Sequence, residues 1–183
     1  VVVRVGERYP FADGTFDAIF SISAFEHIPD LENALRETLR VLKVGGVLFF
    51  KPAWQVRPWA ANWYVVRPNG DFGIEGKLIK FFIPLRNWLT FRLLYIVPQR
   101  IWRTGRYLAH RKTTEQLEYR RLKPNYEKFW DPDSDACNSI DPHAMILWFR
   151  AHGCAVLNYP SLRRAFLVRS NSLIVRKLSD LKP

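Results

Sequence analysis

The residues best suited to chemistry in this 183-residue sequence are an adjacent acid and imidazole, Glu26 and His27. They lie in a loop that follows a short apolar run, residues 16–21. An imidazole in such a loop can take a proton from a hydroxyl or amine nucleophile. The alternative is structural, with the histidine capping the next segment or hydrogen-bonding a backbone carbonyl. The residues by themselves leave both interpretations open.

A strand, a helix and a second strand would position this pair. Residues 16–21 predict a strand buried on both faces, and residues 47–50 predict the second strand. Between them, Asp30 is suited to cap the start of a helix, and Gly45 and Gly46 are suited to end it. One apolar stripe at helical spacing would face the core: Leu31, Ala34, Leu35, Thr38, Leu39 and Leu42.

A strand–helix–strand unit of this length predicts a right-handed crossover and a parallel sheet. Ligands of such sheets bind beyond the carboxyl ends of the strands. In this chain those ends correspond to residues 21–28 and 51–59.

Several short motifs in this unit carry a resemblance to a known family. They follow one another in the family's order and spacing: Pro10-Phe11, Asp13-Gly14, Phe16-Asp17, Glu26-His27, and Leu42-Lys43 with Gly45-Gly46. Residues 5–52 resemble the middle of a class I S-adenosylmethionine-dependent methyltransferase. The resemblance implies an α/β fold, the Rossmann-like three-layer sandwich of that family, and S-adenosylmethionine as the cofactor.

The resemblance also implies roles for individual residues. The loop acid Glu7 would contact the adenine amino group, although a solvated loop glutamate is an equal alternative. Ser21, Ile22 and Ser23 would lie beside the methionine part of the cofactor. Glu26 and His27 would be the catalytic pair next to the transferred methyl group.

The family's Gly-x-Gly-x-Gly cofactor loop has no counterpart here, since the sequence contains no Gly-x-Gly. We therefore expect an N-terminally truncated domain that is weak or inactive by itself. Residues 1–53 would supply the third to fifth strands, residues 54–139 an insertion that covers the substrate, and residues 140–183 the last helix and two strands. That helix would start at Asp141-Pro142, and the final strand would run antiparallel.

Aromatic and basic residues follow the fifth predicted strand. Tryptophans and arginines at the edge of a strand-end cleft suit a ligand that is partly apolar or planar and partly anionic. The alternative is a small satellite core of aromatic side chains. The candidate substrate residues are Trp54, Arg57, Trp59, Trp63, Tyr126 and Trp130.

Residues 77–112 hold nine Lys or Arg and no Asp or Glu, interleaved with large apolar residues. Pro84 and Pro98 are predicted to bracket one helix-length piece. Three interpretations stay open, namely a lid over the cleft, peripheral contact with a membrane surface, and polyanion binding. The basic residues interrupt the apolar run too often for a membrane span.

Composition and net charge indicate the kind of binding partner and the cellular compartment. A net charge of +11 favours an anionic surface or ligand. Cys137 and Cys154 form no disulfide framework, which fits a reducing cytoplasm, with peripheral contact at the inner face of the membrane as an option. No metal site is predicted, because the alternating Asp131, Asp133 and Asp135 lack the Gly and Glu of a calcium loop.

The predicted activity is methyl transfer from S-adenosylmethionine to a small, sugar-linked or lipid-linked acceptor, with oxygen favoured over nitrogen as the acceptor atom. Nucleic acid is not favoured as a substrate, because the strand end lacks the Asn or Asp, paired prolines and aromatic of base amino-methyltransferases. The alternative is a non-catalytic module that binds a membrane or polyanion through residues 77–112.

Overall fold

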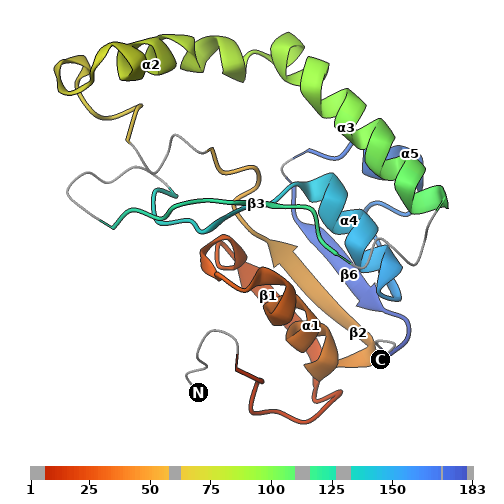
Figure 1. Ribbon diagram of the computed structural model, residues 1–183. Coiled ribbons are helices and arrows are strands. Elements are labelled where there is room, and N and C mark those ends of the chain that lie inside the picture. Colours follow the sequence, from red (N-terminus) through yellow and green to blue (C-terminus); the bar gives the residue numbers. More distant parts are fainter. Residues whose placement is uncertain (1–6, 58–62, 110–115, 127–132, 170, 181–183) are drawn as a thin grey trace.

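The computed structural model describes residues 7–57, 63–109, 116–126, 133–169 and 171–180 (Figure 1). Its centre is a four-stranded sheet in the order β1-β2-β6-β5. β1 (Phe16–Ile22) runs parallel to β2 (Leu42–Lys51). β6 (Leu173–Lys177) is antiparallel to both β2 and β5 (Cys154–Val156). The predicted parallel pair and the predicted antiparallel final strand are both present.

Two helices cover one face of this sheet, α1 (Leu31–Val41) and α4 (Pro142–Ala151) (Figure 1). Both begin at the predicted aspartates. The Asp30 side chain accepts a hydrogen bond from a backbone N–H three residues on, and Asp141 accepts two such bonds at 3.0 and 3.1 Å. All six residues of the predicted apolar stripe are buried, so the stripe forms the contact between α1 and the sheet.

The predicted end of the first helix was wrong. α1 ends at Val41, and the chain enters β2 at once, so that Gly45 and Gly46 lie inside the strand. Gly45 has a φ of +86°, a backbone conformation that favours glycine. A Cβ atom on Gly46 would lie 2.9 Å from the carbonyl oxygen of Lys43, so this position accepts only glycine without a backbone shift. The two glycines therefore shape the start of the strand.

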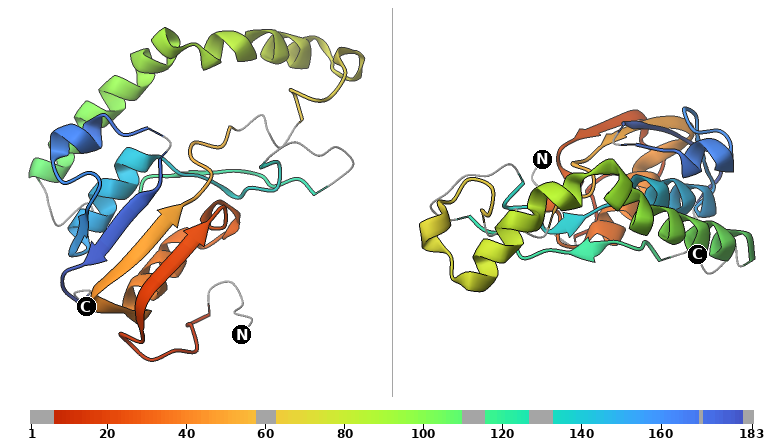
Figure 2. Two further views of the ribbon diagram at one scale, coloured as in Figure 1. Left: turned by 180° about the vertical axis from the view of Figure 1, so that it is seen from behind. Right: turned by 90° about the horizontal axis from the view of Figure 1, so that it is seen from above.

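The opposite face of the sheet carries no helix among the described residues, as the view from behind shows (Figure 2). The predicted burial of β1 on both faces was therefore wrong for this part of the chain. Phe20 is 81% exposed and Ile22 57% exposed, whereas Ile19, which directly precedes Phe20, packs against the core. Strand alternation explains the difference, because side chains two residues apart share a face.

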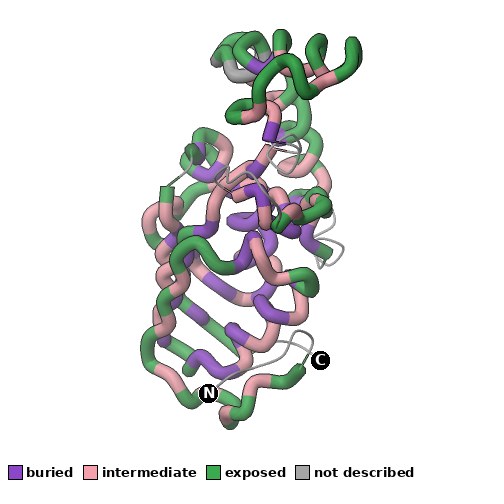
Figure 3. The backbone as a smooth tube through the Cα atoms, turned by 90° about the vertical axis from the view of Figure 1, so that its left-hand side faces the viewer, coloured by how far each residue is buried: buried purple, intermediate pink, exposed green. Residues whose placement is uncertain are grey.

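The basic segment forms an arm of two helices, α2 (Ile74–Asn87) and α3 (Leu89–Ala109) (Figure 1). The prediction that Pro84 and Pro98 bracket one helix was wrong, since each proline lies inside a helix. The break falls instead at Trp88, whose ψ of 136° is extended. α3 contacts α4 and the short α5 (Leu162–Phe166), whereas the far part of the arm is mostly exposed (Figure 3).

Arg40 of α1 holds the loop that leads into β1. Its guanidinium donates to the carbonyl oxygens of Tyr9 at 3.0 Å and Phe11 at 2.9 Å. It also pairs with Asp13 at 2.6 Å and with Glu37 at 2.8 Å. The hydrogen bond from Arg40 holds the pKa of Glu37 below its usual value, despite the opposing effect of burial. The loop is thereby fixed at the amino end of β1.

Candidate functional site

The loop after β1 is anchored at the carboxyl ends of the two parallel strands. The backbone N–H of Ser23, which has a φ of +46°, donates to the carbonyl oxygen of Lys51 at the end of β2 over 2.8 Å. A short 3₁₀ helix, η1 (Phe25–His27), follows. The Phe25 ring is buried and meets Phe50 edge-to-face with ring centroids 5.0 Å apart. This contact packs η1 against β2.

Glu26 and His27 lie together, as the sequence predicted, but two further acids join them. Nε2 of His27 is 3.7 Å from Oε1 of Glu26, which is completely buried. Nδ1 of His27 is 3.5 Å from a carboxylate oxygen of Asp135. Asp133 offers a carboxylate oxygen to the same cluster, and burial raises the pKa of Asp133, with His27 opposing this shift.

The turn with these two aspartates is held against η1 by backbone and amide hydrogen bonds. The N–H of Cys137 donates to the carbonyl oxygen of Glu26 at 2.8 Å, and Nδ2 of Asn138 donates to that of Ile28 at 2.6 Å. Asn138 belongs to β4 (Asn138–Ser139), which pairs with β3 (Arg120–Arg121). Two segments far apart in the sequence therefore form one site.

The residues predicted to bind the cofactor lie in two places. Ser21 is half-buried, and Ile22 and Ser23 are exposed at the carboxyl end of β1. Glu7 is not brought to them. It lies two residues before Tyr9, whose N–H donates to Glu37 near the amino end of β1. No motif in the described residues matches the adenosine part.

The predicted substrate residues are scattered. Nε1 of Trp54 donates to the carbonyl oxygen of Asn171 at 2.9 Å, and Trp63 is buried. The Tyr126 side chain is 77% exposed. Arg57 donates to the hydroxyl of Tyr95 at 3.2 Å. Two others, Trp59 and Trp130, lie outside the described residues.

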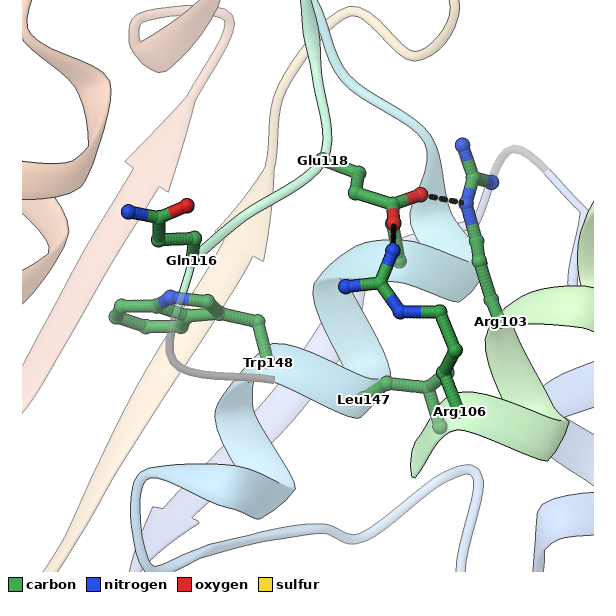
Figure 4. Close-up of a pocket in the computed structure, with 7 residues that line it drawn as sticks. Arg103, Arg106, Gln116, Glu118, Leu147 and Trp148 are labelled. Atoms are coloured by element: carbon green, nitrogen blue, oxygen red, sulfur yellow. Dashed lines mark hydrogen bonds and ion pairs between the residues drawn. The ribbon is translucent and has the colours of Figure 1, made fainter. Parts of the chain in front are cut away.

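Arg57 lines a cavity of about 470 Å³ between α3 and the chain segment that enters β3. Arg103 and Glu118, which the sequence analysis did not single out, form part of its wall. Figure 4 shows Glu118 between two arginines of α3, accepting from Nε of Arg103 at 2.9 Å and from Arg106 at 2.6 Å. Part of the basic charge of the arm is thus paired with a carboxylate of the same chain.

A second anchor of the arm is the buried Arg100. One guanidinium nitrogen donates to the carbonyl oxygen of Val168 at 2.9 Å, and another donates to that of Phe166. Burial lowers the pKa of Arg100, and the nearby Asp141 opposes this shift. A guanidinium held by backbone carbonyls binds α3 to the segment around α5 and is not available to an external anion.

His143 lies where α3 meets α4. Its Nε2 is 3.2 Å from the hydroxyl oxygen of Thr104, and the side chain is fully buried. Burial is the main reason that the pKa of His143 falls to about 4, with Asp141 opposing and Arg100 and Arg103 adding to the decrease. The imidazole is therefore neutral at physiological pH.

None of the described helices is both long enough and apolar enough to cross a membrane.

Comparison with known proteins matches residues 1–50 to the family model described as a methyltransferase domain. A sarcosine/dimethylglycine N-methyltransferase of Halorhodospira halochloris is 44% identical over 55 residues, which are 30% of this chain and 20% of that protein. A malonyl-[acyl-carrier protein] O-methyltransferase of Coxiella burnetii is 54% identical over 50 residues, 26% of this chain and 18% of that protein. No solved structure matches significantly.

A sterol 24-C-methyltransferase of Aspergillus fumigatus is 54% identical over 37 residues, 20% of this chain and 10% of that protein. The chain thus matches a fifth or less of the length of each of these relatives. The resemblance to S-adenosylmethionine-dependent methyltransferases and the Rossmann-like α/β class are confirmed.

Proposed function

We propose that this chain, whose residues 1–50 belong to the methyltransferase-domain family, is part of an enzyme that methylates a small, sugar-linked or lipid-linked acceptor with S-adenosylmethionine. Oxygen is the acceptor atom that we favour, and nitrogen is the second choice. The observation that carries the proposal is the anchored loop of residues 21–27 at the carboxyl ends of β1 and β2. In sheets of this kind, ligands bind at that edge.

Each part of this loop has a proposed role. The cofactor supplies a methyl group on a positively charged sulfur. Ser21, Ile22 and Ser23 would hold its methionine end. His27, with Glu26 beside it, would take the proton of the acceptor, a contribution of roughly 10²–10⁴-fold. Positioning of the two reactants can supply about 7–11 kcal/mol more.

The α2–α3 arm supports the lipid-linked choice of acceptor and a peripheral site at the inner face of a membrane. Its exposed large apolar side chains include Ile74, Phe81, Trp88, Leu94, Ile101 and Trp102. Burying one such side chain in the membrane interface is worth about 1.5–3 kcal/mol. The exposed Lys77 would add roughly 1 kcal/mol on anionic lipid, whereas Lys80 would add less, because its ammonium donates to the carbonyl oxygen of Arg67. Arg100, Arg103 and Arg106 would add little, because they bond within the protein.

A binding and transfer experiment tests the proposal. S-adenosylmethionine is titrated calorimetrically into the 183-residue chain and into the protein in its full encoded length, and transfer of labelled methyl to lipid-linked sugars is then measured. Because the chain contains no Gly-x-Gly, we expect weak binding by the chain and tight binding by the full-length protein. His27→Gln should slow transfer, and Asp71→Asn, an exposed control, should not. Failure of both proteins to bind the cofactor would refute the proposal.

A second candidate function is a non-catalytic membrane-binding module, and the exposed apolar face of the arm favours it. Flotation with vesicles that contain anionic lipid tests it directly. Phe81→Ser combined with Leu94→Ser should abolish flotation, because both side chains are 75% exposed, whereas Thr90→Ser should leave it unchanged. Flotation that survives the double substitution would rule out membrane contact through this face. Flotation without any methyl transfer would favour the module.

A further inference from the structure

Three side chains from two distant segments converge beside the carboxyl end of β1. Glu26 and His27 belong to η1, and Asp133 belongs to the turn before β4. One potential ligand atom from each lies within 4.8 Å of the other two. Atoms that coordinate a divalent ion at about 2.1 Å lie roughly 3–4 Å from one another. A side-chain movement of about 1 Å would therefore complete a three-ligand site.

The burial of Glu26 is a second and independent observation. The residue is 0% exposed, and neither of its carboxylate oxygens receives a hydrogen bond from any described residue. The one ion-pair contact recorded for Glu26 among the described residues is with the ring of His27, whose Nε2 lies 3.7 Å from Oε1, longer than a hydrogen bond. Burying a carboxylate without hydrogen bonds costs folding free energy unless a cation lies beside it. One of its oxygens is a potential ligand atom of the cluster.

The backbone around the cluster is already fixed without help from these side chains. The carbonyl oxygens of Glu26 and Ile28 accept hydrogen bonds from Cys137 and Asn138. These bonds hold the aspartate turn against η1. Asp133 has a φ of +62°, a conformation that non-glycine residues adopt infrequently and that is concentrated at functional sites. The arrangement is that of a site organised before its ligand arrives.

We propose that Glu26, His27 and Asp133 bind one divalent transition-metal ion, and that Asp135 orients the imidazole. Two carboxylates and one neutral imidazole balance a charge of two. Imidazole together with carboxylate suits Zn²⁺ or Mn²⁺, whereas Mg²⁺ and Ca²⁺ prefer oxygen ligands alone. The sequence pattern predicted no metal here, because the alternating aspartates resemble only an incomplete calcium loop.

An ion at this position would lie beside the proposed acceptor site, where it would lower the pKa of a bound hydroxyl. His27 would then be a ligand instead of a base. This role rests on the proposed function, but metal binding itself does not, because it is measured without cofactor or acceptor.

The test uses the purified chain after treatment with a chelator. Mn²⁺ binding is followed by electron paramagnetic resonance and Zn²⁺ binding by calorimetry, with Mg²⁺ and Ca²⁺ for comparison. We expect one ion per chain and a preference of at least about 100-fold over Mg²⁺ and Ca²⁺. Glu26→Gln, His27→Gln and Asp133→Asn should each weaken binding at least about tenfold. The exposed control Asp71→Asn should bind as the parent does.

Two features keep the result decisive. His27 and Asp133 are only partly buried, so their variants should fold even if Glu26→Gln does not, and circular dichroism checks this. Cys137 is close in sequence and could bind Zn²⁺, but Mn²⁺ has little affinity for thiols. No Mn²⁺ binding by the parent, or equal binding by all three variants, would overturn the proposal. So would Zn²⁺ binding that only Cys137→Ser removes.

Discussion

The buried imidazole of His143 should make the stability of this protein depend on pH between about 6.5 and 4. In the folded protein, burial lowers the pKa of His143 to about 4, whereas an exposed histidine titrates near 6.5. Above pH 6.5 the ring is neutral in both states and has no effect. Below pH 6.5, the imidazole takes up a proton in the unfolded chain but stays neutral in the folded protein. The free energy of unfolding therefore falls as the pH falls.

The size of the effect follows from these two pKa values. At 1.36 kcal/mol per pH unit, the full loss is about 3 kcal/mol by pH 4, of which about 2 kcal/mol is lost by pH 5. The loss arises at one contact of the fold, because His143 lies where α3 meets α4, next to Thr104. Protonation also places a positive charge near Arg100 and Arg103, with Asp141 as the nearby acid.

Urea unfolding followed by tryptophan fluorescence, at about pH 7.5 and about pH 5, measures this loss. His143→Gln keeps a polar partner for Thr104 but does not titrate, so its free energy of unfolding should fall by about 2 kcal/mol less than that of the parent. Thr104→Val is the matched control, which removes the hydroxyl and keeps the imidazole and therefore the pH dependence. Equal losses in the parent and in His143→Gln would refute this reasoning.

Two further predictions concern the core. Arg40→Gln should lower the free energy of unfolding by about 2–3 kcal/mol, because it removes bonds to two carbonyl oxygens and leaves Glu37 without its cation; a loss under about 0.5 kcal/mol in urea titration would contradict this. Cys154 should resist thiol reagents at mildly alkaline pH, because burial raises its pKa to about 12. Rapid modification of Cys154 in the folded protein, located by mass spectrometry, would show that the thiol is accessible.

Local sequence patterns predicted much of the arrangement of helices and strands. Asp30 and Asp141 cap their helices because a carboxylate beside free backbone N–H groups is a local arrangement that a few residues specify. The parallel pair follows from the length of the strand–helix–strand unit. The proposed division at residues 53 and 139 stays a prediction.

The prediction failed where distant partners decide. Arg100 belongs to the basic segment for which a lid, membrane contact and polyanion binding stayed open, yet it is buried and donates to backbone carbonyls of Phe166 and Val168, and carbonyls have no sequence signature. His27 meets Asp135 only because Asn138 and its neighbour fasten the aspartate turn to η1. The alternating aspartates were a visible signal, but nothing local connected them with the imidazole.

The outer edge of β1 has a consequence for handling the protein. Among the described residues, no strand pairs with that edge, and the adjoining face exposes Phe20. Unsatisfied N–H and C=O groups along an apolar strand can recruit a strand of another molecule, and the new edge can recruit the next one. This edge is therefore the place where concentrated solutions of the chain would begin to form ordered polymers on storage. A lysine in place of Phe20 would interrupt that growth without entering the core.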